Sequence, residues 1–352
     1  MMHPFRNLLL ISLGRKSSFE KDPTPQDWTY LYHLAHRQAL LGPLNDGIHR
    51  LPAHQMPPED ILKEWDRLTE SIAGIYQTHE KHVAELEALL KRLNLHGCIL
   101  KGTGLAHLYP CPERRMCGDI DLWIAGDRDD IIRTFRDAEI PIYDIIYQEC
   151  KAGIFLDTEV EIHFHPSKMY NPFSNARLQR FFERNTPIRD DFAITYPDAK
   201  FNAIFCMAHM FRHYLEGGIG MRQMMDYYYI LRNLDPADRE SVMKTLKRLG
   251  MKRFTASVMA SMWYNFGLEK ECFLCPPDKK RGKKLVNDSF AMGNFGVMDK
   301  RNRANEGETK WGRFLRKNLR VFSNLRYYPR EVIWSPFARV SQFVWRKFKG
   351  YL

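Results

Sequence analysis

The feature that most constrains the fold is the segment GDIDLWI at residues 118–124, in which two aspartates alternate with apolar residues. Alternation with a period of two is typical of a β-strand with one polar and one apolar face. Asp119 and Asp121 therefore point to the same side, and two carboxylates that close raise each other's pKa unless a cation lies between them. Mg²⁺, or Mn²⁺ in its place, is the usual ion, because it accepts one or two carboxylates together with phosphates. We therefore expect a divalent metal site on this strand.

A second alternating segment, EVEIHFH at residues 159–165, places Glu159, Glu161, His163 and His165 on one strand face. If this strand lies beside the first, Glu161 completes a cluster of three carboxylates, whereas Glu159 is interpreted as part of a solvent-exposed edge. Two metal ions in such a cluster can activate an attacking hydroxyl and stabilise a leaving oxygen. The two histidines leave an alternative open, a hydrolase with zinc or iron bound to the HxH pair.

The segment LKGTG at residues 100–104 places two glycines and a threonine where a strand meets a helix. Backbone N–H groups in such a turn can bind phosphate. We expect Lys101, Gly102 and Thr103 to contribute to a triphosphate-binding turn. Arg115, four residues before Asp119, is a candidate for bidentate phosphate binding.

Changes in periodicity along the chain predict an α+β fold, with a small mixed sheet between N-terminal and C-terminal helical segments. Helical spacing over residues 25–43 ends at Gly42-Pro43, and residues 57–96 indicate one long helix or a broken pair. The predicted organisation is an N-terminal helical segment at 1–96, an α/β core at 97–170, a helical domain at 171–290 and a basic, aromatic C-terminal extension at 291–352.

Four polar residues in the helical domain, together with His163 of the second strand, are candidates for a cleft wall. His209 and His213 lie four residues apart on one expected helix, and Arg222 and Asp226 lie four apart on the next, across a break at Gly217-Gly218. The alternative is a purely structural role, in which Arg222 pairs with Asp226 and the histidines form local hydrogen bonds.

Charge and composition point to anionic partners and a reducing compartment. The formal charge of +11 favours nucleotides, nucleic acid or an acidic membrane face as partners. The extension alternates Arg and Lys with aromatic residues, so it is interpreted as docked amphipathic helices, as an anionic membrane-surface contact, or as a nucleic-acid contact. Seven scattered cysteines do not resemble a disulfide framework, and no stretch reaches the roughly 20 apolar residues of a membrane span. We expect a cytoplasmic protein, with membrane-surface association as the alternative.

The motif LKGTGLAHLYPCPERRMCGDIDLWI, followed about forty residues later by VEIHFHPS, resembles the nucleotidyltransferase superfamily related to DNA polymerase β. More narrowly, it is similar to an uncharacterised bacterial nucleotidyltransferase group, over roughly residues 25–270. The resemblance implies that Gly102 and Thr103 occupy the signature turn, that Asp119 and Asp121 are the metal-binding pair, and that Glu161 is the third carboxylate. One departure is a longer insert between the turn and the aspartates.

The same resemblance implies an enzyme that transfers a nucleotidyl group from an NTP, such as ATP, to an acceptor hydroxyl with release of pyrophosphate. Magnesium would be the cofactor, and the helical domain would pack over the nucleotide. The sequence leaves the acceptor open. Two alternatives from other classes remain, the metal-dependent hydrolase and a non-catalytic protein that binds nucleic acid or a membrane surface.

Overall fold

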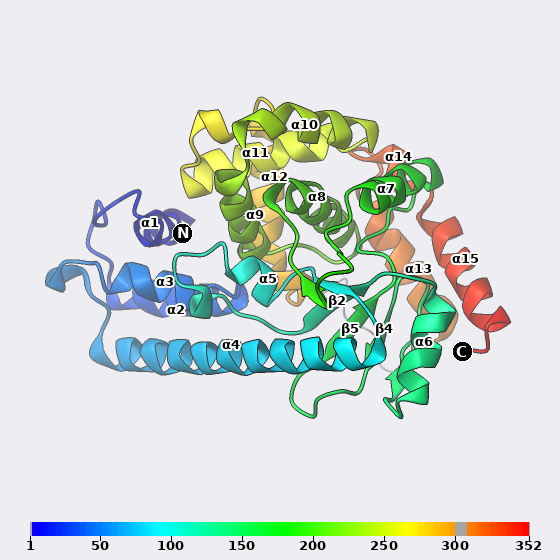
Figure 1. Ribbon diagram of the computed structural model, residues 1–352. Helices are drawn as coiled ribbons and strands as arrows, with labels where there is room; N and C mark the ends of the chain where they lie inside the picture. Colours follow the sequence, from blue (N-terminus) through cyan, green and yellow to red (C-terminus); the bar gives the residue numbers. More distant parts are fainter. Residues whose placement is uncertain (1, 300–307, 352) are drawn as a thin grey trace.

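The computed structural model of the chain describes residues 2–299 and 308–351, so part of the predicted extension, residues 300–307, lies outside the described residues (Figure 1). The predicted α+β class is confirmed, because helices flank a six-stranded mixed sheet of order β3-β4-β5-β2-β1-β6. The strands are β1 (Gly97–Ile99), β2 (Ile120–Ile124), β3 (Ile142–Tyr143), β4 (Glu149–Ala152), β5 (Val160–His163) and β6 (Ile194–Thr195).

The N-terminal helices are α1 (Met2–Ser12), α2 (Pro25–Arg37), α3 (Leu41–Ile48) and α4 (Glu59–Leu93). The predicted helix end at Gly42-Pro43 is wrong, since the chain turns at Ala39, which has a φ of 55°. Gly42 and Pro43 lie in the first turn of α3, where proline is tolerated because its missing N–H has no partner in the helix. Gly42 allows a close contact here, since a Cβ would lie 2.2 Å from the carbonyl oxygen of Arg114.

Helix α4 is one unbroken helix of 35 residues along the lower edge of Figure 1. It ends at Asn94, which adopts the left-handed conformation (φ 52°, ψ 43°) common after a helix C-terminus. Its first half packs Trp65 and Ile72 into the core of the helical part. Its second half packs Leu86 and Leu90 into a separate core under the sheet. One helix therefore contributes to both hydrophobic cores.

The remaining helices lie above or beside the sheet in Figure 1, except α6 (Arg128–Asp137), which packs with the second half of α4 in the core under the sheet. They are α5 (Thr103–Ala106), α6 (Arg128–Asp137), α7 (Pro172–Arg184), α8 (Ala199–Glu216), α9 (Met221–Asn233), α10 (Arg239–Arg248), α11 (Lys252–Phe266), α12 (Lys279–Met292), α13 (Lys310–Phe322), α14 (Pro329–Val332) and α15 (Ser335–Phe348). Helices α8 and α9 are separated at Gly217-Gly218, as predicted. Helix α1 packs on α3 and α11, so the N-terminal helices and the later helices share one core.

The sheet register brings the two predicted polar segments together. Strand β2 runs parallel to β5, with Asp121 opposite Glu161, and β5 pairs antiparallel with β4, with His163 opposite Glu149. Gly102, which joins β1 to α5, has a φ of +58°, and a Cβ there would lie 3.0 Å from the carbonyl oxygen of Asp119. A glycine is needed at this turn because L-residues rarely adopt that backbone conformation.

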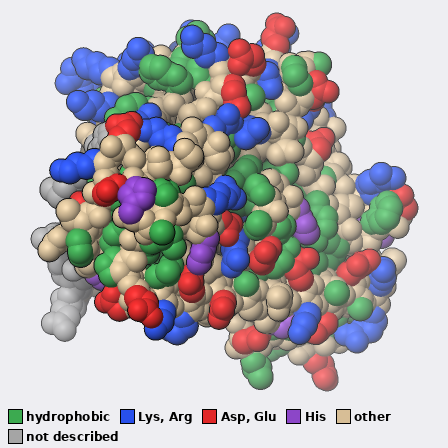
Figure 2. Space-filling model, turned by 90° about the vertical axis from the view of Figure 1, so that its left-hand side faces the viewer, with side chains coloured by type: hydrophobic (Ala, Val, Ile, Leu, Met, Phe, Trp, Pro, Cys, Tyr) green, Lys and Arg blue, Asp and Glu red, His purple; other side chains and the backbone are tan. Residues whose placement is uncertain are grey.

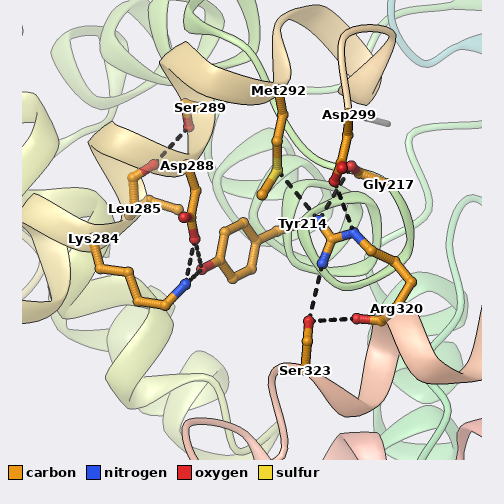
Figure 3. Close-up of polar contacts among 10 residues, drawn as sticks. All are labelled: Tyr214, Gly217, Lys284, Leu285, Asp288, Ser289, Met292, Asp299, Arg320 and Ser323. Atoms are coloured by element: carbon orange, nitrogen blue, oxygen red, sulfur yellow. Dashed lines mark hydrogen bonds and ion pairs between the residues drawn. The ribbon is translucent and has the colours of Figure 1, made fainter. Parts of the chain in front are cut away.

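The inner side of the C-terminal extension is docked on the rest of the protein, which confirms the first of its three interpretations. The buried Arg320 of α13 binds the carbonyl oxygen of Gly217 at 3.2 Å and the carboxylate of Asp299 at 3.3 Å (Figure 3). On α14, the buried carboxylate of Glu331 accepts hydrogen bonds from the backbone N–H groups of Tyr170 and Asn171. In the described part of the chain, no helix combines the length and apolar character needed to cross a membrane.

Candidate functional site

A cavity of about 200 Å³ lies between one face of the neighbouring strands β2 and β5 and the helices α8 and α9. Most of the predicted polar residues line it, together with several that the sequence did not single out. Its charged, histidine and glutamine side chains are Lys101, Arg115, Asp119, Asp121, Glu149, Glu161, His209, Arg212, His213, Arg222, Gln223 and Asp226. The structure therefore brings the strand carboxylates and the expected helical wall to one place.

Asp121 is the most enclosed carboxylate of the cavity, with 1% of its side chain exposed. Its Oδ1 lies 2.6 Å from Lys101 Nζ and 2.8 Å from His163 Nε2. Burial alone would raise the pKa of Asp121, but the two cationic neighbours outweigh burial and lower the pKa below its ordinary value. Its second oxygen, Oδ2, is buried and has no hydrogen-bond partner among the described residues.

His163 links three carboxylates from neighbouring strands. Besides Asp121, its ring nitrogens lie 3.7 Å from Glu161 Oε2 and 3.5 Å from Glu149 Oε2. Burial opposes protonation, but the hydrogen bond to Asp121 and the nearby carboxylate of Glu161 raise the pKa of His163 to about 9. The imidazolium in turn lowers the pKa of Glu161. His163 therefore balances the negative charge of the cluster.

The expected HxH pair does not form, because β5 ends at His163 and the two rings diverge. His165 stacks on Tyr147 with the ring centres 5.4 Å apart, beside a different cavity. Two histidines on one metal ion were the basis of the hydrolase alternative, so this arrangement does not support it.

Asp119 shares the cavity with Asp121, as the strand alternation predicted. The negative charge of Asp121, followed by burial, raises the pKa of Asp119 to about 6. Such a rise is expected of two carboxylates that share a site without an intervening cation.

The cluster offers donor atoms that fit a divalent cation. Ligand atoms of Asp121, Glu161 and His163 all lie within 4.8 Å of one another, and because the protonated ring of His163 has no free lone pair, the carboxylates would supply the donor atoms. The unpartnered Oδ2 of Asp121 and the raised pKa of Asp119 both indicate excess negative charge that a cation would neutralise. Carboxylate oxygens are the ligands that Mg²⁺ and Mn²⁺ prefer.

Arg115 lines the cavity, but its charge is already paired within the protein. Its guanidinium is buried and binds Asp226 through two hydrogen bonds of 2.8 and 2.9 Å. Tyr109 donates a third hydrogen bond, of 2.7 Å, to the same carboxylate. Arg115 is thus neutralised by an internal ion pair, which does not fit its predicted role as a phosphate-binding cation. The alternative that pairs Asp226 with Arg222 is also wrong.

Arg222 and Arg212 form the cationic part of the helical wall. Arg222 donates to the carbonyl oxygen of Met116 at 3.1 Å and lies over the ring of Phe295, without a carboxylate at ion-pair distance in the described chain. Its charge partly offsets the raised pKa of Asp119, so the two groups interact across the cavity. Arg212 donates to Gln148 at 2.7 Å. Arg212 was missed, although it lies three residues after His209 and thus on the same helix face.

The two helical histidines line the wall as expected and are uncharged. Burial, followed by the positive charge of Lys101, lowers the pKa of His209 well below its ordinary value. Burial and Arg212 lower the pKa of His213 to about 3. In the predicted phosphate turn, Lys101 and Gly102 line the cavity. The hydroxyl of Thr103 is buried without a hydrogen-bond partner among the described residues.

The fold and the site define a mixed α/β protein with a buried acidic centre that fits a divalent cation and faces a cationic helical wall. Residues 24–265 match the family model of uncharacterised nucleotidyltransferases, and the chain belongs to this family. The match includes the whole sheet and helices α2 to α10. Neither a search of curated proteins nor a search of solved structures found a match.

Proposed function

We propose that the protein is a Mg²⁺- or Mn²⁺-dependent nucleotidyltransferase with a core like that of the DNA polymerase β superfamily. It would transfer a nucleotidyl group from an NTP to an acceptor hydroxyl and release pyrophosphate. The observation that carries this proposal is the convergence of Asp119, Asp121 and Glu161 in one cavity opposite Arg212 and Arg222. The chain's membership of the nucleotidyltransferase family supports it.

Asp119, Asp121 and Glu161 would hold the metal. When bound, the ion would neutralise negative charge on the phosphates and favour ionisation of the acceptor hydroxyl. His163 positions this set, because it bonds to Asp121 at 2.8 Å and lies 3.7 Å from Glu161. The imidazolium also keeps Glu161 ionised, as a metal ligand or a proton acceptor must be.

The positive side chains would bind the triphosphate. Lys101 lies at the carboxylate side of the cavity, 2.6 Å from Asp121. At this position its ammonium group would also bind a phosphate as a point charge. Arg222, whose Nε is buried without a hydrogen-bond partner in the described residues, offers a planar donor group suited to phosphate oxygens. In this proposal Arg222 takes the role that the sequence analysis gave to Arg115.

A thermal-shift experiment on Asp119→Asn tests the proposal. Because Asp121 repels Asp119, the neutral variant should be at least as stable as the wild type without ligand. A ligand that binds only the folded state adds about 2.7 kcal/mol at a hundredfold excess over Kd. We expect one of the four common NTPs to raise Tm in the presence of Mg²⁺, and Asp119→Asn to lose this shift.

The exposed Asp190→Asn is the matched control and should keep the shift. Release of pyrophosphate from the NTP that binds would then measure the transfer itself. The proposal fails if no NTP gives a Mg²⁺-dependent shift, or if Asp119→Asn responds like the wild type.

A further inference from the structure

The C-terminal segment, defined here as residues 308–351, carries most of the net charge of the protein. It contains eleven Lys and Arg residues against two Glu, a formal charge of +9 out of +11 for the whole chain. On the face in Figure 2, by contrast, basic and acidic side chains are interspersed. The positive charge is thus concentrated in one short part of the chain.

This segment is held in place by its inner side, so its outer side has a defined orientation. Arg320 joins α13 to the end of α8, and Val321 and Val332 are fully buried. In Figure 1, α15 lies at the outer edge of the molecule, beside the C-terminus. The outer surface of α13 and α15 is therefore held in a fixed position on the rest of the protein.

The outer side of the segment is apolar to an unusual degree. Of the 24 exposed large apolar residues in the described chain, eleven lie within residues 311–348, far more than their share of the length. Along α13 they recur every three or four residues, which is one helix face; they are Trp311, Leu315, Leu319 and Phe322. The same spacing continues before and along α15, with Ile333, Phe337, Val340, Val344 and Phe348.

A groove of about 530 Å³ separates the two helices. Four cations line it, Arg313, Lys317, Arg339 and Arg346, and the described lining contains no carboxylate. Aromatic and aliphatic side chains from both helices form most of the remaining wall. Such a groove complements a ligand with an anionic group and an apolar body.

We propose that α13 and α15 bind the anionic face of a phospholipid bilayer. The exposed stripes would enter the boundary between headgroups and acyl chains, and the groove cations would bind lipid phosphates. A nucleic acid would use the same charges, but it gains mainly from stacking on aromatic rings. Five of the nine stripe residues are Leu, Ile or Val, which cannot stack but gain free energy when they leave water. The apolar composition therefore favours lipid.

Co-sedimentation of the full chain with vesicles tests this proposal. One vesicle type is phosphatidylcholine alone, and the other is an equimolar mixture of phosphatidylcholine and phosphatidylglycerol. We expect binding to the mixed vesicles only, weakened when salt rises from about 0.1 M to about 1 M and the Debye length falls from about 10 Å to about 3 Å.

Two double variants separate the charge from the apolar contribution. Lys317→Gln with Lys347→Gln should weaken binding roughly fivefold for each cation removed. Phe337→Ser with Phe348→Ser should also reduce binding at least tenfold, because the two phenyl rings, which are 64% and 87% exposed, would otherwise leave water on binding. All four positions are exposed, so the folded protein should keep its Tm.

Matched controls lie elsewhere on the surface. Leu156→Ser with Phe173→Ser removes two apolar side chains that are at least as exposed as the tested pair, at 109% and 67%, and Lys244→Gln with Lys247→Gln removes two exposed cations of α10. Both controls should bind vesicles like the wild type. The proposal is overturned if the wild type ignores the mixed vesicles, if the segment variants bind as well as the controls, or if those variants lose binding to single-stranded RNA but not to vesicles. Vesicle binding requires neither metal nor NTP, so its outcome is independent of the proposed catalytic activity.

Discussion

The ion pair between Arg115 and Asp226 connects the loop before β2 to helix α9, and Asp226→Asn tests its contribution to stability. Only 3% of the Arg115 side chain and 8% of the Asp226 side chain are exposed. Asparagine keeps the shape of the side chain, but it removes the negative charge and turns an amide donor toward donors of Arg115 or Tyr109. The guanidinium is then left buried without a counter-charge.

Breaking one partner of a buried ion pair costs about 3–5 kcal/mol, because the remaining charge is not solvated. We expect Asp226→Asn to lower the free energy of unfolding by this amount, measured by urea denaturation at neutral pH. The pair of Arg189 and Asp191 provides the comparison, since it has the same bidentate geometry at 3.1 and 2.9 Å but is 64% and 57% exposed.

Asp191→Asn should cost less than about 1 kcal/mol, because water screens an exposed pair. If Asp226→Asn and Asp191→Asn lower the free energy of unfolding by the same amount, burial does not increase the contribution of Asp226 to stability. Our assignment of Arg115 and Asp226 as a buried internal ion pair is then refuted.

Two further predictions concern the helices. Burial raises the pKa of Glu331 from 4.5 to about 7. Between these pH values the folded protein therefore binds more protons than the unfolded chain. As a result, its free energy of unfolding falls by about 3 kcal/mol as the pH rises from 4.5 to about 7. Glu331→Gln should remove this pH dependence in urea denaturation, and parallel wild-type and variant profiles would contradict the prediction. Gly282→Ala should destabilise the α11–α12 contact by about 1–3 kcal/mol, because the new Cβ would lie 2.3 Å from that of Ala260. Gly74→Ala on the exposed side of α4, where a Cβ meets nothing within 4 Å, should instead stabilise by up to about 1 kcal/mol; equal changes in Tm would contradict this contrast.

Short-range periodicity predicted the acidic centre well. The alternation around Asp119 and Asp121 and around Glu161 depends only on strand geometry, and two parallel strands placed the carboxylates in one cavity. The same argument failed at His165, because the strand ends at His163 and the alternation no longer applies. Periodicity determines which face a side chain occupies only while the strand continues.

Contacts between distant residues could not be predicted in this way. Arg115 and Asp226 are 111 residues apart, and each had a nearer charged candidate in the sequence. The end of α2 was also misplaced, since the chain reverses at Ala39 in a left-handed conformation that alanine rarely adopts. Tertiary packing decided both cases, and packing between distant segments is invisible to local patterns.

Helix α4 has a mechanical consequence for the cavity. At 1.5 Å per residue its 35 residues span about 52 Å, and its two halves are embedded in different hydrophobic cores. The sheet contributes to both cores: Ile120, Leu122 and Ile124 of β2 lie in the core under the sheet, whereas Trp123, on the strand face that carries Asp121, lies in the core that contains α8 and α9. Moving the strand wall away from α8 and α9 would break this packing and bend α4, so the two cores should melt in a single transition. Substrates would enter a preformed site through side-chain and loop movements, without closure of two lobes around a hinge.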